Sequence, residues 1–172
     1  MGRKRPTIFT LDLATTTGFA EGPAGCAPRF WSERLAPKGA PQEELFSGLI
    51  RHVGLHLKAF PPDIVAVEEP DLFRLKAGVA TRQSIEVLFG LSAVAQGVAH
   101  RMGVRRISRV AANDVRAFFV GQRKLKREDA KRLTVAECRR RGWEVRNDDE
   151  GDACALHAFM SEVVRREGGW DE

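Results

Sequence analysis

Hydrophobic and polar residues form two kinds of pattern along this chain, a strand-like pattern first and a mainly helical one afterwards. Short apolar runs lie at residues 8–14, 19–20 and 29–35, and Thr-, Gly- and Pro-rich segments separate them. Such runs with turn residues between them are typical of buried strands joined by hairpins. The N-terminal part of the chain is therefore predicted to be an antiparallel meander.

From residue 43 onward the apolar residues follow helical spacing, with short buried runs between the helices. Pro61 and Pro62 are predicted to end the first helix. Strands are predicted at 64–67 and 104–110, and helices at 43–60, 81–102, 113–120, 128–141 and after Asp149. This order predicts an α/β fold with a mixed sheet, antiparallel first and parallel later, in a single domain of residues 1–172 with a basic N-terminal tail at 1–6.

The helix predicted at 81–102 is apolar over more than one stripe. Large residues such as Ile85, Phe89 and Val98 are interspersed with the small residues Gly90 and Gly97. One face is expected to meet the sheet, and the other is either internal as well or an interface with a second copy of the chain. A homodimer through this helix is the hypothesis that connects the pattern to function.

Composition and charge favour a protein that binds a polyanionic partner and argue against a membrane span. The chain has 172 residues, a formal charge of +5 and a pI near 9.5, and basic residues cluster at 105–109, 124–132 and 139–141. A polyanion is the natural partner of such a surface, although basic runs are also common on solvated faces. No apolar run approaches the roughly 18 residues that a membrane span needs, and no signal sequence is evident, so a cytoplasmic protein without a membrane span is expected. Cys26, Cys138 and Cys154 are too scattered for a zinc site and are expected to be free thiols.

Acidic residues interrupt the apolar pattern where carboxylates are costly. Asp12 is placed in the middle of a predicted strand, where it needs either a cation or a hydrogen bond from the turn at residues 15–17. Glu68 and Glu69 end the strand predicted at 64–67, where open α/β sheets bind ligands. Strand alternation allows only one of the two glutamates to face a site, and does not say which.

A further acidic cluster, at residues 147–152, precedes the last helix. Helix capping accounts for Asp148 or Asp149, but not for Asp152, which is expected on the same face as Asp149. Carboxylates brought together in this way suit two-metal phosphodiester hydrolysis, because divalent cations neutralise them and hard oxygen ligands suit magnesium. A basic protein with an acidic pocket is the expected pattern of a nuclease.

Three motifs carry a resemblance to the RuvC-type family of Holliday junction resolvases. IFTLDLATTTGFA resembles the family's first strand and hairpin, VAVEEP its second acidic strand, and DDEGDACALHAF its closing helix. The resemblance covers roughly residues 8–164, and KREDAKR with RRRGW resembles the phage-type variant. It implies an RNase H-like fold with a mixed five-stranded sheet flanked by helices, and a dimeric, metal-dependent endonuclease that makes paired nicks in four-way DNA junctions.

The resemblance also implies roles for individual residues. Asp12, Glu68, Asp149 and Asp152 match the family's metal-binding acids and would hold two Mg²⁺ ions, with Mn²⁺ expected to substitute. Lys131 matches a basic catalytic residue that contacts the scissile phosphate, and Lys126 competes for this role. Phe73 is the candidate for the aromatic wedge, or else a loop residue that packs on the core. The expected DNA contacts are Phe73, Lys124, Lys126, Arg127 and Lys131.

Other functions and residues stay open at this level. An RNase H-like nuclease for RNA–DNA hybrids or flaps, and a junction-binding protein without catalysis, are the rival interpretations. His52 and His56 have a metal-ligand spacing but are expected to be a solvent-facing pair, because no third ligand is evident. His157 is a candidate for the edge of the acidic pocket.

Overall fold

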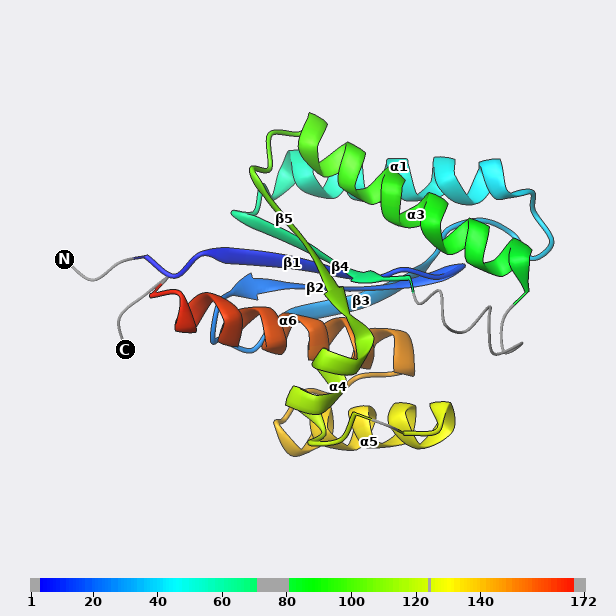
Figure 1. The fold of residues 1–172 in the computed structure, drawn as a ribbon. Helices are drawn as coiled ribbons and strands as arrows, with labels where there is room; N and C mark the ends of the chain where they lie inside the picture. The colour runs from blue at the N-terminus through cyan, green and yellow to red at the C-terminus, as the bar shows by residue number, and fades with distance from the viewer. Residues whose placement is uncertain (1–3, 71–80, 124, 169–172) are drawn as a thin grey trace.

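The computed structural model describes residues 4–70, 81–123 and 125–168, which form a mixed five-stranded sheet (Figure 1). The strands are β1 (Thr7–Asp12), β2 (Thr16–Pro23), β3 (Arg29–Arg34), β4 (Ile64–Glu69) and β5 (Arg106–Ala111), in the order β3-β2-β1-β4-β5. The first three pair antiparallel, while β4 pairs parallel with both β1 and β5. The predicted change from meander to parallel strands is thereby confirmed.

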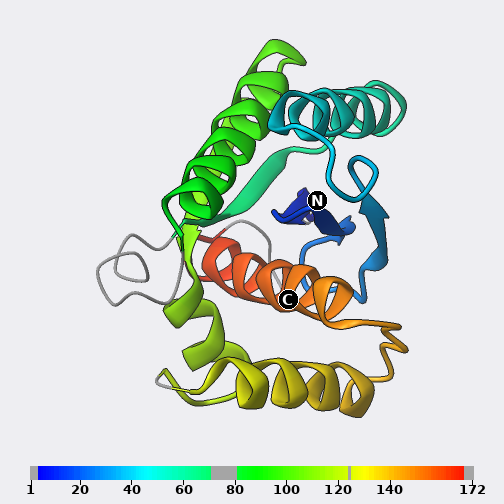
Figure 2. The same ribbon diagram turned by 90° about the vertical axis from the view of Figure 1, so that its right-hand side faces the viewer.

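Helices cover both faces of this sheet, as the end view in Figure 2 shows. On one face lie α1 (Gln42–Ala59) and α3 (Arg82–Arg101), which pack against each other. On the other face lies α6 (Asp148–Arg166), with α5 (Arg127–Arg140) beyond it and the short α4 (Ala112–Phe119) connecting to β5. The sheet is therefore the central layer between two unlike helical layers.

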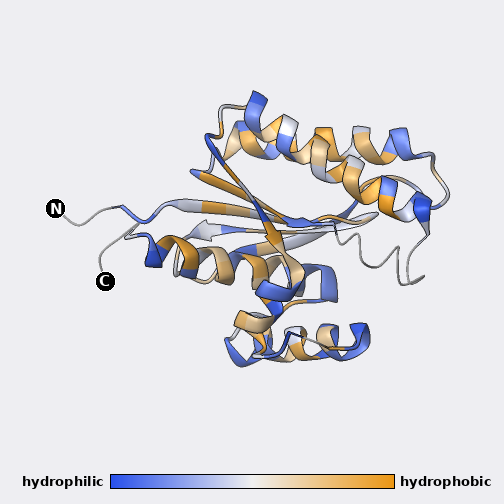
Figure 3. Ribbon diagram, in the orientation of Figure 1, coloured by the Kyte–Doolittle hydropathy of each residue, from blue (hydrophilic) through white to orange (hydrophobic). Residues whose placement is uncertain are grey.

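Strand alternation divides the apolar residues between two cores. Ile8, Ile64 and Ala66 face α6, whereas Val65 and Val67 face α1 and α3. Figure 3 shows hydrophobic residues along the central strands and α6, and mostly hydrophilic residues on α5. Helix α5 thus packs by a narrow stripe of Ala130, Thr134 and Cys138 and turns the rest of its surface outward.

The apolar surface of α3 is divided between α1 and solvent. Gly90 lies so close to Phe46 of α1 that a Cβ atom there would come within 2.3 Å of the phenylalanine ring. Phe89, which is 40% exposed, forms an outward stripe with the exposed Ala93 and Gly97. Part of the second apolar face is therefore internal, and part stays on the surface.

Two predictions about composition can be compared directly with the fold. All three cysteines lie in the described residues and are free thiols, as expected. Across the residues that the structure describes, no helix combines the length and the apolar character needed to cross a membrane.

Candidate active site

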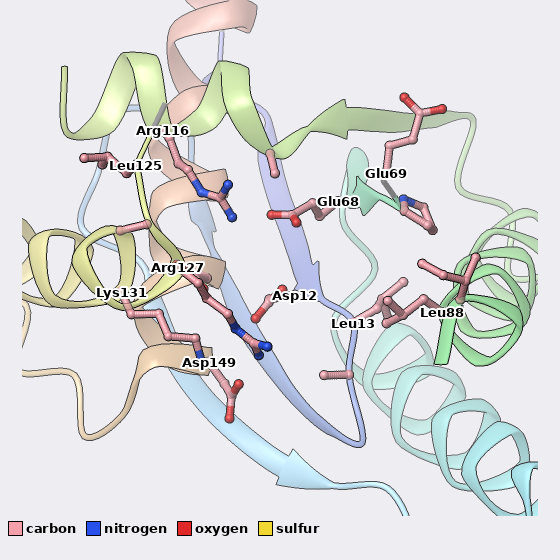
Figure 4. Close-up of a pocket in the computed structure, with 16 residues that line it drawn as sticks. Asp12, Leu13, Glu68, Glu69, Leu88, Arg116, Leu125, Arg127, Lys131 and Asp149 are labelled. Atoms are coloured by element: carbon pink, nitrogen blue, oxygen red, sulfur yellow. The ribbon is translucent and has the colours of Figure 1, made fainter. Parts of the chain in front are cut away.

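The carboxyl ends of β1 and β4 open into a cavity of about 410 Å³ between the sheet, α3, α4 and the start of α6 (Figure 4). Its charged lining brings together residues that are distant in the sequence: Asp12, Glu68, Glu69, Arg116, Arg127, Lys131, Asp149 and Asp152. All four acids expected to bind metal therefore line one pocket. In an open α/β sheet, this edge is where ligands bind.

Asp12 is the last residue of β1, not the middle residue of a longer strand as the apolar run indicated. Strand β1 ends there because the chain turns into β2, and Asp12 pairs in register with Gly18. The hydroxyl of Thr17 donates to the carbonyl of Ala14 at 2.9 Å, so that turn side chain is engaged elsewhere. The carboxylate of Asp12 is left facing the cavity without a hydrogen bond from the turn.

Glu68 and Glu69 lie on opposite faces of β4, as alternation requires. Glu68 shares the α6 face with Ile64 and Ala66, and its negative charge acts on Asp12. Figure 4 shows the carboxylate of Glu68 directed into the cavity, on the side of Arg116 and Asp12, and that of Glu69 directed away. Glu69 instead lies beside Arg109, whose Nη1 is 3.9 Å from its Oε1. Of the two glutamates, Glu68 thus lies on the same face of the sheet as Asp12 and remains the candidate ligand.

Helix α6 begins with a cap that fixes the direction of its acidic first turn. The side chain of Asn147 accepts a hydrogen bond from the backbone N–H of Glu150 at 2.9 Å and donates one to the hydroxyl of Ser32 at 2.9 Å. Glu150 is fully buried, and its carboxylate accepts bonds from the guanidinium and the backbone N–H of Arg146. Asp149 and Asp152 are then left on the cavity side of the helix.

Gly18 allows α6 to come close enough for this arrangement. A Cβ atom at Gly18 would lie 1.9 Å from the carbonyl oxygen of Asp149, which is too close for any side chain to be accommodated. Beside it, the hydroxyl of Thr10 donates to the carbonyl of Ala153 at 2.8 Å. Because Gly18 also pairs with Asp12, the same contact brings the first and last acidic motifs together.

Burial and mutual repulsion disfavour the charged forms of the clustered acids. Burial, followed by the charges of Asp152, Glu68 and Asp149, raises the pKa of Asp12 well above its ordinary value. Burial also raises the pKa of Asp149, and it raises that of Asp152 to about 6 in spite of the opposing charge of Arg116. Within the described part of the chain, no cation forms an ion pair with Asp12, Asp149 or Asp152. The charges of Lys131, Arg127 and Arg116 act on these acids without direct ion pairs, and a bound cation would relieve the repulsion that remains.

Three basic side chains line the same cavity. Lys131 and Arg127 project from α5, and Lys131 forms an ion pair with Asp148. Lys126, its competitor in the sequence, is exposed at the N-cap of α5 and does not line the cavity. Arg116 of α4 was missed by sequence reasoning, because an arginine in a short helix is an ordinary surface residue unless the fold turns it inward.

Two expected DNA contacts, Phe73 and Lys124, lie outside the described residues. The predictions for the histidines fail in part. His56 is not solvent-facing, because it stacks on Phe9 with ring centroids 4.4 Å apart and pairs with Glu21. His157 lies in the core beneath β2, with Nε2 3.2 Å from the carbonyl oxygen of Gly22, and does not line the acidic cavity.

The acids surround the cavity without forming a closed coordination shell. Among the residues that the structure describes, no group of three or more His, Cys, Asp or Glu side chains is close enough to hold one ion. The donor set nevertheless fits Mg²⁺, since it consists of carboxylate oxygens whose mutual repulsion a divalent cation would relieve.

Comparison with solved structures decides the fold. The chain superimposes on Thermus thermophilus RuvC in complex with a Holliday junction substrate with a TM-score of 0.70, at 18% identity over 96% of this chain and 98% of that one. The chain has the RuvC fold. A second structure of T. thermophilus RuvC matches with a TM-score of 0.65, at 19% identity and the same coverage. The yeast mitochondrial Holliday junction resolvase Ydc2 matches with 0.59, at 11% identity over 97% of this chain and 83% of that chain.

Sequence comparisons alone do not reach these structures. Neither the models of known protein families nor the curated protein sequences gave a match. The similarity is thus one of fold, at 18% and 19% identity to the two T. thermophilus structures, and this fold places the three acidic motifs around one cavity.

Proposed function

We propose that this protein is a divalent-metal-dependent endonuclease of the RuvC family that resolves four-way DNA junctions. The observation that carries the proposal is the convergence of Asp12, Glu68, Asp149 and Asp152 in one cavity of a RuvC fold. Three independent segments of the chain supply these acids. Structural stability does not account for the cluster, because burial and repulsion raise the pKa of three of them.

The four acids would hold two Mg²⁺ ions, with Mn²⁺ able to replace them. Bound there, the ions supply the Lewis acidity by which water attacks a phosphodiester and the leaving oxygen is stabilised. Asp12 is the central ligand of this proposal, because the charges of the other three acids all act on it. Asp149 and Asp152, one turn apart on α6, complete the set from the opposite wall.

The basic side chains of the cavity would position the DNA strand. Arg116 and Arg127 both act electrostatically on Asp152, so they lie close enough to the acids to contact the phosphate that is cut. Lys131 would exchange its partner Asp148 for a phosphate oxygen. Arginine and lysine suit this role because they neutralise phosphate in a partly desolvated pocket. Lys126, on the exposed side of α5, would contact the backbone farther from the cut.

A homodimer through α3 is the assembly that fits symmetric cutting. The exposed stripe of Phe89, Ala93 and Gly97 supports it, since an aromatic residue beside two small ones can pack closely against a copy of itself. A two-fold axis at this stripe would place two acidic cavities on two strands of one junction. Sedimentation of wild type and Phe89→Asp tests this assembly independently of cleavage.

The decisive experiment is cleavage of a labelled four-way junction in Mg²⁺, beside duplex, flap and RNA–DNA hybrid of the same sequence. Wild type and Asp12→Asn are compared after gel-shift assays in Ca²⁺ or EDTA have shown equal junction binding. Paired symmetric nicks in the junction, absent from Asp12→Asn, are the expected result.

The other outcomes separate the rivals. Cutting of hybrid or flap in preference to the junction would keep the metal site and replace the substrate. Junction binding without nicking in either Mg²⁺ or Mn²⁺ would identify a binding protein that has kept the fold and lost catalysis.

A further inference from the structure

A second concave site lies on the opposite face of the sheet from the acids. It is a pocket of about 290 Å³ between the end of α1 and the strands β2 and β3. Phe9 and Phe19, both fully buried, form its floor. Its walls are Arg29, Trp31, His52, Leu55, His56, Ala59 and Phe60, and we refer to it as the aromatic pocket.

The floor of the aromatic pocket is a ladder of nearly parallel rings across three strands. The ring centroids of Phe19 and Trp31 lie 5.3 Å apart with an interplanar angle of 17°, and those of Phe9 and Phe19 lie 5.8 Å apart at 6°. Phe19 and Trp31 are register partners on β2 and β3. This shared register makes the pocket shape a property of the sheet rather than of a loop.

The rim of the aromatic pocket exposes apolar side chains that a buried core would enclose. Leu55 is 65% exposed and Phe60 is 55% exposed, on the last two turns of α1 and its C-cap. The guanidinium of Arg29 lies 5.1 Å from the ring centroid of Trp31 and 5.7 Å from that of Phe60. Large apolar groups that surround an open pocket are typical of interaction sites.

The charges around the rim are positive. Residues 51–60 of the chain include the bases Arg51 and Lys58 but no acid. The carboxylate of Glu21 beside the pocket is engaged by His56 at 2.5 Å and by Arg29 at 3.6 Å. A partner that enters here must therefore carry negative charge beside an apolar group.

The open edge of the sheet favours a peptide over a nucleic acid strand. In the described part of the chain, β3 pairs with β2 only, so one edge of β3 presents unpaired backbone groups next to the pocket. An extended peptide can pair with such an edge while one of its side chains fills a pocket beside it. The proposed DNA site lies across the sheet, so a strand held there does not pass over this pocket.

We propose that the aromatic pocket and the edge of β3 bind an extended acidic segment of a partner protein, with one apolar side chain in the pocket. Arg29, Arg51 and Lys58 contact the flanking acids. Such a contact would bring the protein to its site of action without occupying the acidic cavity.

The test uses a short fluorescein-labelled peptide in which aspartates flank one phenylalanine, titrated into the full-length protein and followed by fluorescence anisotropy. Leu55→Asp is compared with Ile50→Asp, because Ile50 is 50% exposed on the same helix and does not line the pocket. Leu55→Asp should weaken binding by about tenfold or more, while Ile50→Asp should leave it unchanged. Arg29→Glu should weaken it as well, and a peptide with alanine in place of phenylalanine should bind less.

Three results would overturn the proposal. They are no binding of the peptide to wild type, equal losses for Leu55→Asp and Ile50→Asp, and Leu55-dependent binding of a labelled oligothymidylate instead of the peptide. Circular dichroism of each variant establishes that it is folded. Junction cleavage by Leu55→Asp should equal that of wild type, so failure of this proposal is distinguishable from failure of the nuclease assignment.

Discussion

The first two turns of α6 contain four acids, which form one acidic cluster in the sequence but fall into two pairs with different surroundings in the structure. Asp148 and Glu150 each have a cation, Lys131 in one case and Arg146 in the other. Asp149 and Asp152 face the cavity without an ion pair, and burial raises the pKa of both. Asp148 and Glu150 therefore stabilise the start of the helix, whereas Asp149 and Asp152 make it less stable when no cation is bound.

This difference teaches how to separate structural from functional carboxylates. A buried acid with its own arginine and backbone donors, such as Glu150, is accounted for by the fold. Acids that are brought together without direct ion pairs store unfavourable free energy, which is retained where function requires it. Substitutions that neutralise one pair or the other should therefore have opposite consequences.

The largest expected effect is on catalysis. Asp152→Asn should lower junction nicking by about a thousandfold or more, because removing a metal ligand removes most of the transition-state stabilisation that the metal provides. Rates under single-turnover conditions, measured with enzyme in saturating excess over labelled junction and with saturating Mg²⁺, give the comparison. Glu150→Gln is the matched control and should nick at the wild-type rate wherever it is folded. Equal losses in the two variants would contradict the division of the acids.

The next effect is on stability, where Glu150→Gln should be the more damaging of the two substitutions. Glu150→Gln should lower the free energy of unfolding by about 2 kcal/mol, because the buried charge-assisted bonds to Arg146 are lost. Asp152→Asn should leave that free energy unchanged or raise it in EDTA. Urea unfolding followed by circular dichroism measures both. A Glu150→Gln protein as stable as wild type would show that the ion pair with Arg146 contributes little.

The order of strands and helices and the acidic motifs could be predicted from the sequence, because both depend on local residue patterns. Alternation along β4 states that Glu68 and Glu69 face opposite ways, but only the position of α6 decides which face holds the site. The same is true of Asp148 and Asp149, which are neighbours at one helix start and differ only in what lies opposite. The periodicity of apolar residues does not predict contacts between distant segments.

Arg116 and His56 are two residues whose surroundings could not be predicted without contacts between distant segments. Arg116 looks like a surface residue of a short helix until α4 is placed over the cavity. His56 has the spacing of a solvent-facing pair with His52, but β2 supplies Glu21 and β1 supplies Phe9 as its partners. In both cases the deciding neighbour comes from another element of the fold.

A smaller effect is the pH dependence of stability in EDTA. The pKa of Asp152 is raised from 3.8 to about 6, so the folded state binds more protons than the unfolded state between those values. Stability should therefore fall as pH rises from about 4 to 6, by on the order of 2 kcal/mol from this group, and level off above. Urea unfolding at a series of pH values should show a flatter profile for Asp152→Asn than for Asp148→Asn. Profiles of equal slope would mean that Asp152 is solvated in solution.

The smallest effect concerns the ion pair between Asp148 and Lys131. Their side chains are 33% and 35% exposed, so solvent screens the pair, and Asp148→Asn should change the free energy of unfolding by less than about 1 kcal/mol. Lys131→Ala should have an equally small effect on stability, but should weaken junction binding or nicking, because Lys131 also lines the acidic cavity. Urea unfolding and single-turnover nicking of both variants separate the two roles. Equal nicking by Lys131→Ala and wild type would restrict Lys131 to its pair with Asp148, and would leave Arg116 and Arg127 as the phosphate contacts of the cavity.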